Sequence, residues 1–143
     1  MSSRVGKISL SLCRSVVNLY GSIVKWISFN MKNVIVIWNS KDTNWLCAGI
    51  TIYDPEFWGK GIGYEALGLW CEYLFEHHKE IVRLDLPTWS GNIGLVKLAK
   101  KLGFVQEACF RKARIVDGKY YGSIGLGILR EEFIEKYPRG FLK

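Results

Sequence analysis

The sequence predicts an α/β fold with a mixed sheet built around a parallel β-α-β unit. Residues 45–53 are apolar and rich in strand-forming residues, and apolar side chains then recur at helical spacing from Ala66 up to a second apolar strand at 81–86. A helix that crosses over between two such strands makes them parallel. Asp117-Gly118 separates two further strand-like segments, which predicts a hairpin with antiparallel strands.

Length and composition are those of one domain. The chain has 143 residues, of which 49% are hydrophobic and 23% charged. This hydrophobic content is far too high for a disordered chain. No run approaches the roughly 18 apolar residues that a membrane span needs. We therefore expect a single domain over 1–143 with no membrane partner.

The first 43 residues allow two interpretations. They contain many serines and several basic residues, with no acidic residue before Asp42, which is typical of a targeting presequence. Against this, alternating apolar residues at 8–12 and the β-branched run at 34–38 indicate strands. We favour strands or a short helix that belong to the fold.

Proline and glycine mark most of the remaining boundaries. Asp54-Pro55 ends the 45–53 strand, because proline cannot continue a central ladder. Residues 90–92 open a second helix and Gly103 ends it. The predicted elements are strands at 34–38, 45–53, 81–86, 104–116 and 120–129, and helices from Ala66 to about Glu80, from 92 to 102, and from Glu131 to about Pro138.

A glycine-rich loop lies between the 45–53 strand and the first helix. Gly59, Gly61 and Gly63 would let the backbone approach an anion closely, and the N–H groups of the helix's first turn favour negative charge. The loop matches neither GxxxxGK[ST] nor GxGxxG, and no Ser or Thr follows Lys60 to hold magnesium. The sequence predicts a metal-free phosphate-binding loop, with a tight turn as the alternative.

Two blocks of the sequence, 58–63 and 90–104, resemble the GNAT superfamily of acetyl-CoA-dependent N-acetyltransferases. The family signature is Gln/Arg-x-x-Gly-x-Gly/Ala, in which Gly61 and Gly63 occupy the two small positions. Trp58 stands where Gln or Arg is usual, as is common in the RimJ/RimL-like branch, which acetylates amino groups including protein N-termini.

The second block supports the same resemblance. Asn92 opens the second helix and residues 101–104 close it with Lys-Leu-Gly-Phe, as in the family. The end of the hairpin at 127–132 is similar as well, so the match runs from about residue 44 to 133. The resemblance implies a mostly antiparallel, GNAT-like sheet around an acetyl-CoA-binding core.

The resemblance implies acetyl-CoA as cosubstrate and no metal. The loop amides would hold its diphosphate, and the pantetheine arm would lie where the strand ending at Tyr53 diverges from 81–86. A backbone N–H near Ile52 or Tyr53 would polarise the thioester carbonyl, and lysines would screen the 3′-phosphate. A plain N-cap is the alternative for Asn92. The cofactor-binding residues so implied are Ile52, Tyr53, Trp58, Gly59, Lys60, Gly61, Ile62, Gly63, Asn92, Lys97 and Lys101.

Catalysis in this family is direct attack by a neutral amine. Many relatives carry a Tyr acid on the second helix, where this chain has Ala99. We expect Ser90 or Tyr53 as the proton donor, with Tyr64 or a water as further options and a turn or capping role as the alternative for Ser90. The candidate bases are Asp54, Glu56 and Glu107.

The acceptor would be a protein N-terminus or a small-molecule amine. The 57 residues before Trp58 are fewer than relatives usually have. The N-terminal part, about 1–43, would then be abbreviated, or a homodimer would complete the substrate wall. With Ala99, this also keeps open a catalytically idle CoA-binding or regulatory module.

Charge, cysteine and histidine patterns complete the expectations. The basic segment 97–119 would attract polyanions, but it carries few aromatic residues, so we do not expect nucleic acid as the partner. Scattered cysteines among apolar residues indicate buried, reduced thiols in a cytoplasmic protein. The adjacent His77 and His78 cannot readily serve one metal ion.

Overall fold

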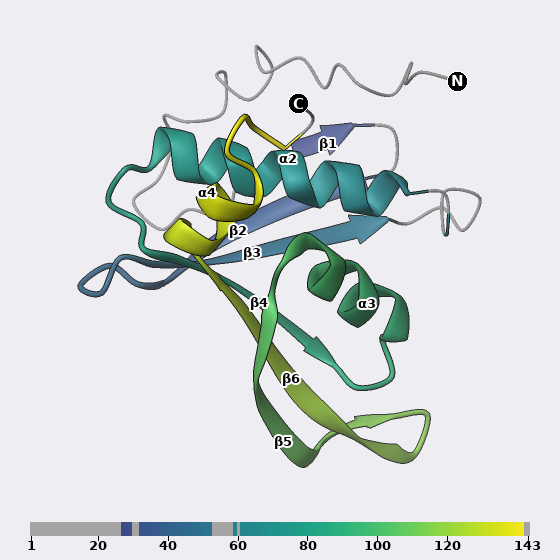
Figure 1. Cartoon of the computed structure of the whole chain (residues 1–143). Helices are drawn as coiled ribbons and strands as arrows, with labels where there is room; N and C mark the ends of the chain where they lie inside the picture. The colour runs from purple at the N-terminus through teal and green to yellow at the C-terminus, as the bar shows by residue number, and fades with distance from the viewer. Residues whose placement is uncertain (1–26, 30–31, 53–58, 60, 142–143) are drawn as a thin grey trace.

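The computed structural model describes residues 27–29, 32–52, 59 and 61–141. They form a six-stranded sheet in the order β1-β2-β3-β4-β6-β5, with three helices (Figure 1). The elements are β1 (Ile27–Phe29), β2 (Lys32–Ser40), β3 (Trp45–Ile52), α2 (Ile62–His77), β4 (Arg83–Trp89), α3 (Ile93–Leu102), β5 (Val105–Val116), β6 (Lys119–Leu129) and α4 (Arg130–Lys136).

The sheet is mixed and mostly antiparallel, as the sequence predicted. Among the described strands, β3 and β4 form the one parallel pair, and α2 crosses between them. The β-α-β unit is therefore confirmed. The predicted strand at 34–38 lies within β2, whereas the expectation for residues 8–12 falls outside the described residues.

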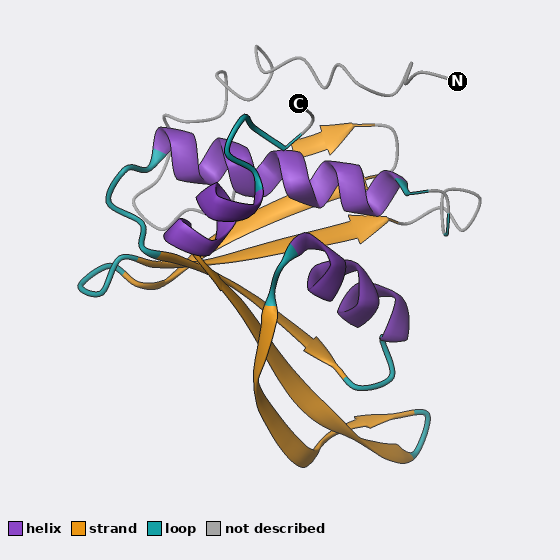
Figure 2. Cartoon of the chain, in the orientation of Figure 1, coloured by secondary structure: helices purple, strands orange, loops and turns teal. Residues whose placement is uncertain are grey.

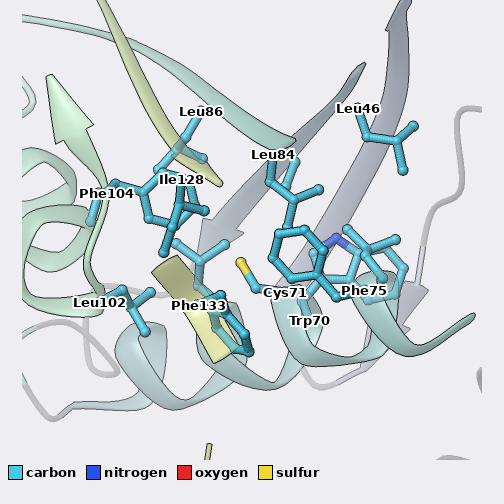
Figure 3. Packing of buried hydrophobic residues seen from close by; sticks show 14 of the residues in the cluster. Leu46, Trp70, Cys71, Phe75, Leu84, Leu86, Leu102, Phe104, Ile128 and Phe133 are labelled. Atoms are coloured by element: carbon cyan, nitrogen blue, oxygen red, sulfur yellow. The ribbon is translucent and has the colours of Figure 1, made fainter. Parts of the chain in front are cut away.

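The core lies between the sheet and the helices (Figure 2). Alternate residues of β3, β4 and β6 are buried on the face that α2 covers, as period-two strands require. Figure 3 shows Leu84, Leu86 and Ile128 of the sheet beside Cys71 of α2 and Phe133 of α4. In the part of the chain that the structure describes, no helix is long and apolar enough to cross a membrane.

The hairpin is built as predicted. Asp117 (φ 50°) and Gly118 (φ 73°) both take the left-handed conformation that a two-residue turn of type I′ requires. Gly103 (φ 117°) ends α3, and its N–H donates to the carbonyls of Ala99 and Lys100. Local chemistry sets these boundaries.

The predicted bounds of α2 and β4 were wrong, and α2 begins at Ile62, before the predicted Ala66. α2 ends at His77 and not near Glu80, because His78 leaves the helical conformation and its N–H closes on the carbonyl of Leu74. β4 begins at Arg83 and runs through Pro87 to Trp89, whereas the sequence placed this strand at 81–86.

Pro87 is tolerated inside β4 because its backbone nitrogen faces β3 beyond the segment in which the two strands pair. Ser90 N–H donates to Gly122 of β6, so even-numbered backbone groups of β4 face β6 and odd-numbered ones face β3. Pro87 lies two residues beyond the last pair between β4 and β3. Its missing N–H therefore deprives no β3 residue of a bond.

The prediction of buried thiols was wrong for one cysteine. Cys71 is buried and Cys47 half-buried, but Cys109 is exposed. It lies on β5, the edge strand, where most side chains face solvent. Cys13 falls outside the described residues.

Arg130 joins the end of α2 to the start of β4. Its guanidinium donates hydrogen bonds to the carbonyl oxygens of Phe75 (2.8 Å), His78 (2.6 Å) and Ile81 (2.6 Å). The guanidinium carbon also lies 4.9 Å from the centroid of the Phe75 ring. One side chain thus satisfies three carbonyls at the turn that follows α2.

Replacing Arg130 by Met should lower the free energy of unfolding by about 3 kcal/mol, because three carbonyls lose charged donors. Urea unfolding followed by circular dichroism measures this. Arg139→Met, at an exposed position, is the matched control and should change stability little. Equal losses in the two variants would contradict the role given to Arg130.

Candidate functional site

The glycine loop opens at the N-terminus of α2. Gly59 (φ 70°) and Gly61 (φ 77°) are left-handed, and a Cβ at either position would meet no described atom within 4 Å. Gly61 is the N-cap, and no side chain caps α2 there. No described side chain therefore caps the first-turn N–H groups, which together with the positive end of the helix dipole favour an anion. Gly63, in the first turn of α2, differs from these two glycines because it is buried.

β3 and β4 diverge beside this loop. They pair at Trp45–Arg83, Leu46–Leu84 and Cys47–Asp85, and no later residues of the two strands pair. We call this divergence, beyond Cys47 of β3 and Asp85 of β4, the fork. It has the position that the sequence analysis gave to the pantetheine arm.

Backbone polar groups of both strands face into the fork. The odd-numbered backbone groups of β4 face β3, and in a parallel pair they bond to the residues on either side of their partners, so the even-numbered backbone groups of β3 face β4. Beyond the paired segment these groups belong to Ile50 and Ile52. Opposite them, the odd-numbered groups of β4 belong to Pro87 and Trp89. Donors and acceptors thus lie where an extended ligand arm could pair with them.

α3 contributes a cap and two lysines. The Oδ1 atom of Asn92 accepts a bond from Leu95 N–H at 3.2 Å, so Asn92 is the N-cap of α3. The Nζ atom of Lys101 lies 4.3 Å from the ring centroid of Tyr64, in the first turn of α2. Lys97 is exposed one helical turn earlier on α3. Lys101 therefore adds positive charge beside the first turn of α2.

The expected proton donors have different surroundings. Ser90 is tied to β6: its N–H donates to the carbonyl of Gly122 (2.9 Å), and its Oγ accepts from Gly122 N–H (3.0 Å). The ring of Tyr64 packs on Phe141, with centroids 5.3 Å apart. Ala99 is fully buried in the core. Tyr53, Asp54, Glu56, Trp58 and Lys60 lie outside the described residues.

A charged cluster that the sequence analysis missed occupies the opposite face of the sheet. Arg83 and Asp85 alternate with the buried Leu84 and Leu86, so they project away from the helices. The Oδ1 atom of Asp85 lies 3.6 Å from Arg83, and its Oδ2 atom accepts a bond of 3.2 Å from Asn39 of β2. None of the described helices covers this face.

Asp85 stands at the apex of the fork, as the last residue of β4 that pairs with β3. Its side chain is 16% exposed, and burial raises the pKa of its carboxyl, although Arg83 and Asn39 lower it in part. Burial, together with Asp85, raises the pKa of the nearby Cys47 thiol to about 11. An acid between Leu84 and Leu86 was the signal in the sequence, since a charge there must face away from the core.

Glu107, the described member of the predicted bases, lies farther from the fork. It pairs with Arg83 at 2.5 Å, across β6. Gly127 of β6 permits this contact, because a Cβ there would collide with both side chains. Arg83 therefore separates Glu107 from Asp85 and forms an ion pair with each.

The histidines have structural partners. The His77 ring stacks on Tyr73 with centroids 4.0 Å apart, and the His78 ring packs edge-on to Trp38. Among the described residues, no three His, Cys, Asp or Glu side chains gather closely enough to hold a metal ion.

Comparison with known proteins identifies the family of this fold and site. The family model for an acetyltransferase (GNAT) domain matches residues 29–105. The chain is 30% identical over 84 residues to the SPbeta prophage-derived uncharacterized N-acetyltransferase YokL of Bacillus subtilis (strain 168), a match that covers 59% of this chain and 46% of YokL. The chain thus spans about half the length of this curated relative.

Solved structures share the fold at low identity. A mutant of the spermidine N-acetyltransferase SpeG of Vibrio cholerae superposes with a TM-score of 0.67 and 20% identity, covering 78% of this chain and 67% of SpeG. RimL, a ribosomal-protein alpha-N-acetyltransferase solved with coenzyme A, gives a TM-score of 0.61 and 17% identity, covering 68% of this chain and 54% of RimL.

The raised pKa of Asp85 predicts a pH dependence of stability. The folded protein holds this proton more tightly than the unfolded chain, so the stability that the proton contributes is full below the ordinary carboxyl value of 3.8 and is lost as pH rises through the raised pKa. Asp85→Asn cannot titrate. The free energy of unfolding of the wild type, relative to this variant, should therefore fall as the pH rises from below 3.8 through the raised pKa. Urea unfolding at each pH measures it, and a constant or rising difference would contradict the assignment.

Proposed function

This chain belongs to the GNAT acetyltransferase family, and we propose that it transfers an acetyl group from acetyl-CoA to a primary amine. The observation that carries the proposal is the uncapped, glycine-bounded N-terminus of α2 beside the fork. The Trp-Gly-Lys-Gly loop further favours the RimJ/RimL-like branch of the family.

The described residues fit the cosubstrate. Open left-handed glycines leave room for a diphosphate at the loop, and the first-turn amides of Ile62 and Gly63 would hold it. Lys97 and Lys101, with Lys60, would neutralise the remaining phosphate charge. Backbone groups of Ile52 in the fork, and Tyr53 beyond it, would hold the pantetheine arm, and Asn92 would cap α3 beside it. Bound acetyl-CoA supplies the thioester carbonyl that the amine attacks.

The chain's own groups move the protons. An alkyl ammonium must lose a proton before its nitrogen can attack. We assign this proton to the carboxylate of Asp85, whose raised pKa makes it a better proton acceptor than an ordinary aspartate. Ser90 would pass its hydroxyl proton to the departing sulfur and take in exchange the second proton that the attacking nitrogen loses, because Gly122 N–H occupies one acceptor position of Oγ and leaves the O–H free to turn. Tyr53 is the alternative donor.

A catalytically idle CoA-binding module is the second candidate. It is favoured by the fully buried Ala99, which supplies no proton donor from α3. This module would bind acetyl-CoA as well as an enzyme would, but it would acetylate no amine. Binding and turnover must therefore be measured separately.

Acetyl-CoA should bind the wild type and stabilise it by about 2.7 kcal/mol at 100 times its Kd. Gly61→Ala should weaken this binding about tenfold, since its Cβ enters the space left for the ligand and strains a left-handed residue. Isothermal titration measures both. Gly118→Ala is the matched control, because φ is similarly positive (73°) and its Cβ also meets no described atom. No heat with the wild type at millimolar acetyl-CoA would overturn the proposed function.

Asp85→Asn should lower kcat/KM for an amine about 100-fold near neutral pH, and leave the KM for acetyl-CoA unchanged. Raising the pH should recover part of this loss, because more of the amine is then neutral. Glu107→Gln is the control, since it breaks the other ion pair of Arg83 away from the fork. A larger loss in Glu107→Gln would transfer the role of base to Glu107.

A further inference from the structure

The far half of the β5–β6 hairpin extends beyond the end of β4 (Figure 1). Trp89, the last residue of β4, pairs with Ser123 of β6. From there to the turn, β6 pairs with β5 alone among the described strands. We call residues 109–122 the ribbon. Most of its side chains are exposed, so it presents both of its faces to solvent.

The ribbon is basic and partly apolar. It carries four cations against the single acid Asp117, whereas α2 carries three glutamates and neither Lys nor Arg. Phe110 is 65% exposed, Ile115 59% and Tyr120 61%. The ribbon cations are Arg111, Lys112, Arg114 and Lys119. This combination suits a ligand with negative charge and some apolar surface.

A bulge interrupts the ribbon, and two contacts tie the ribbon to β4. The pairing of β5 with β6 shifts between Phe110 and Arg114, and Lys112 within this stretch has φ 56°. The guanidinium of Arg114 lies over the ring of Trp89, 5.6 Å from its centroid. The Tyr121 ring meets Trp89 edge-on, with centroids 4.8 Å apart. The ribbon is therefore anchored to the last residue of β4.

Trp89 connects the ribbon to Asp85. The two residues are four apart on β4, so they project from the same face, which is the face opposite the helices. At about 3.3 Å per residue they stand about 13 Å apart. A polypeptide of a few residues can span this distance with its amine near Asp85 and the rest of its chain on the ribbon.

We propose that the ribbon binds the acceptor, and that the acceptor is an acidic polypeptide whose amine reaches the fork. This inference rests on the proposed function. The cations of the ribbon would repel a polyamine such as spermidine, whose charges are all positive. They would attract a segment rich in Asp and Glu, while the positive amine itself meets Asp85.

Nucleic acid fits the chemistry of the site less well. It offers the same negative charge, but its base amines are conjugated with aromatic rings and are poor nucleophiles. The ring of Tyr120 also has Lys112 over it, with Nζ 5.9 Å from its centroid, which occupies a face that a base would need for stacking.

The test compares two peptides that share their first two residues and continue with an acidic or a glutamine-rich segment. The wild type should have at least about a tenfold higher kcat/KM for the acidic peptide at low salt, and this preference should shrink at about 0.5 M NaCl. The double variant Arg111→Glu, Lys112→Glu should lose the preference. Lys79→Glu, at the opposite end of β4, is the control and should retain it.

A binding measurement separates this inference from the proposed function. Fluorescence anisotropy of a labelled acidic peptide should show binding to the wild type and about tenfold weaker binding to the double variant. Such binding without transfer to any amine would support the ribbon and overturn the proposed function. Transfer with equal use of both peptides, or with a preference for spermidine, would overturn the ribbon as an acceptor site. Displacement of the peptide by single-stranded RNA at far lower concentration than by unlabelled peptide would also overturn it.

Discussion

The pairing of β3 with β4 over three residues, followed by their divergence, is the constraint on which the site depends. Each strand keeps its other neighbour, since β2 holds β3 and β6 holds β4. β3 and β4 can therefore separate in the middle of the sheet while each strand still pairs with its other neighbour. Burial of α2 against both halves holds the open sheet together. Backbone groups of the fork that find no strand partner among the described residues cost stability, and ligand binding can recover that cost.

The position of α2 follows from the same constraint. β3 and β4 are parallel, so the chain must leave the C-terminal end of β3, cross over as a helix, and return to the start of β4. The N-terminus of α2 therefore lies at the end of the sheet where the fork is widest. The amides of the first turn and the unpaired groups of the two strands become neighbours through topology alone. Left-handed glycines then let an anion approach these amides.

Sequence reasoning succeeded where one short segment decides the structure. Asp117-Gly118 favours the two-residue turn between β5 and β6. Asn92 and Gly103 cap α3, and the glycine loop precedes α2. It failed where distant residues decide. α2 stops at His77 in a turn whose carbonyls Arg130 holds from more than 50 residues away. Asp85 becomes part of the site only because β3 diverges beside it, which no residue near Asp85 encodes.

The face of the sheet opposite the helices carries charges of both signs, and their separation explains how both can attract a ligand. Asp85 lies at the apex of the fork, Arg83 separates it from Glu107, and Arg114 of the ribbon lies over Trp89. The distance of about 13 Å along β4 exceeds the Debye length of about 8 Å at physiological salt. The two groups therefore neutralise each other little through solvent. A ligand with a positive end and a negative body meets attraction at both places, whereas a uniformly charged ligand is repelled at one of them.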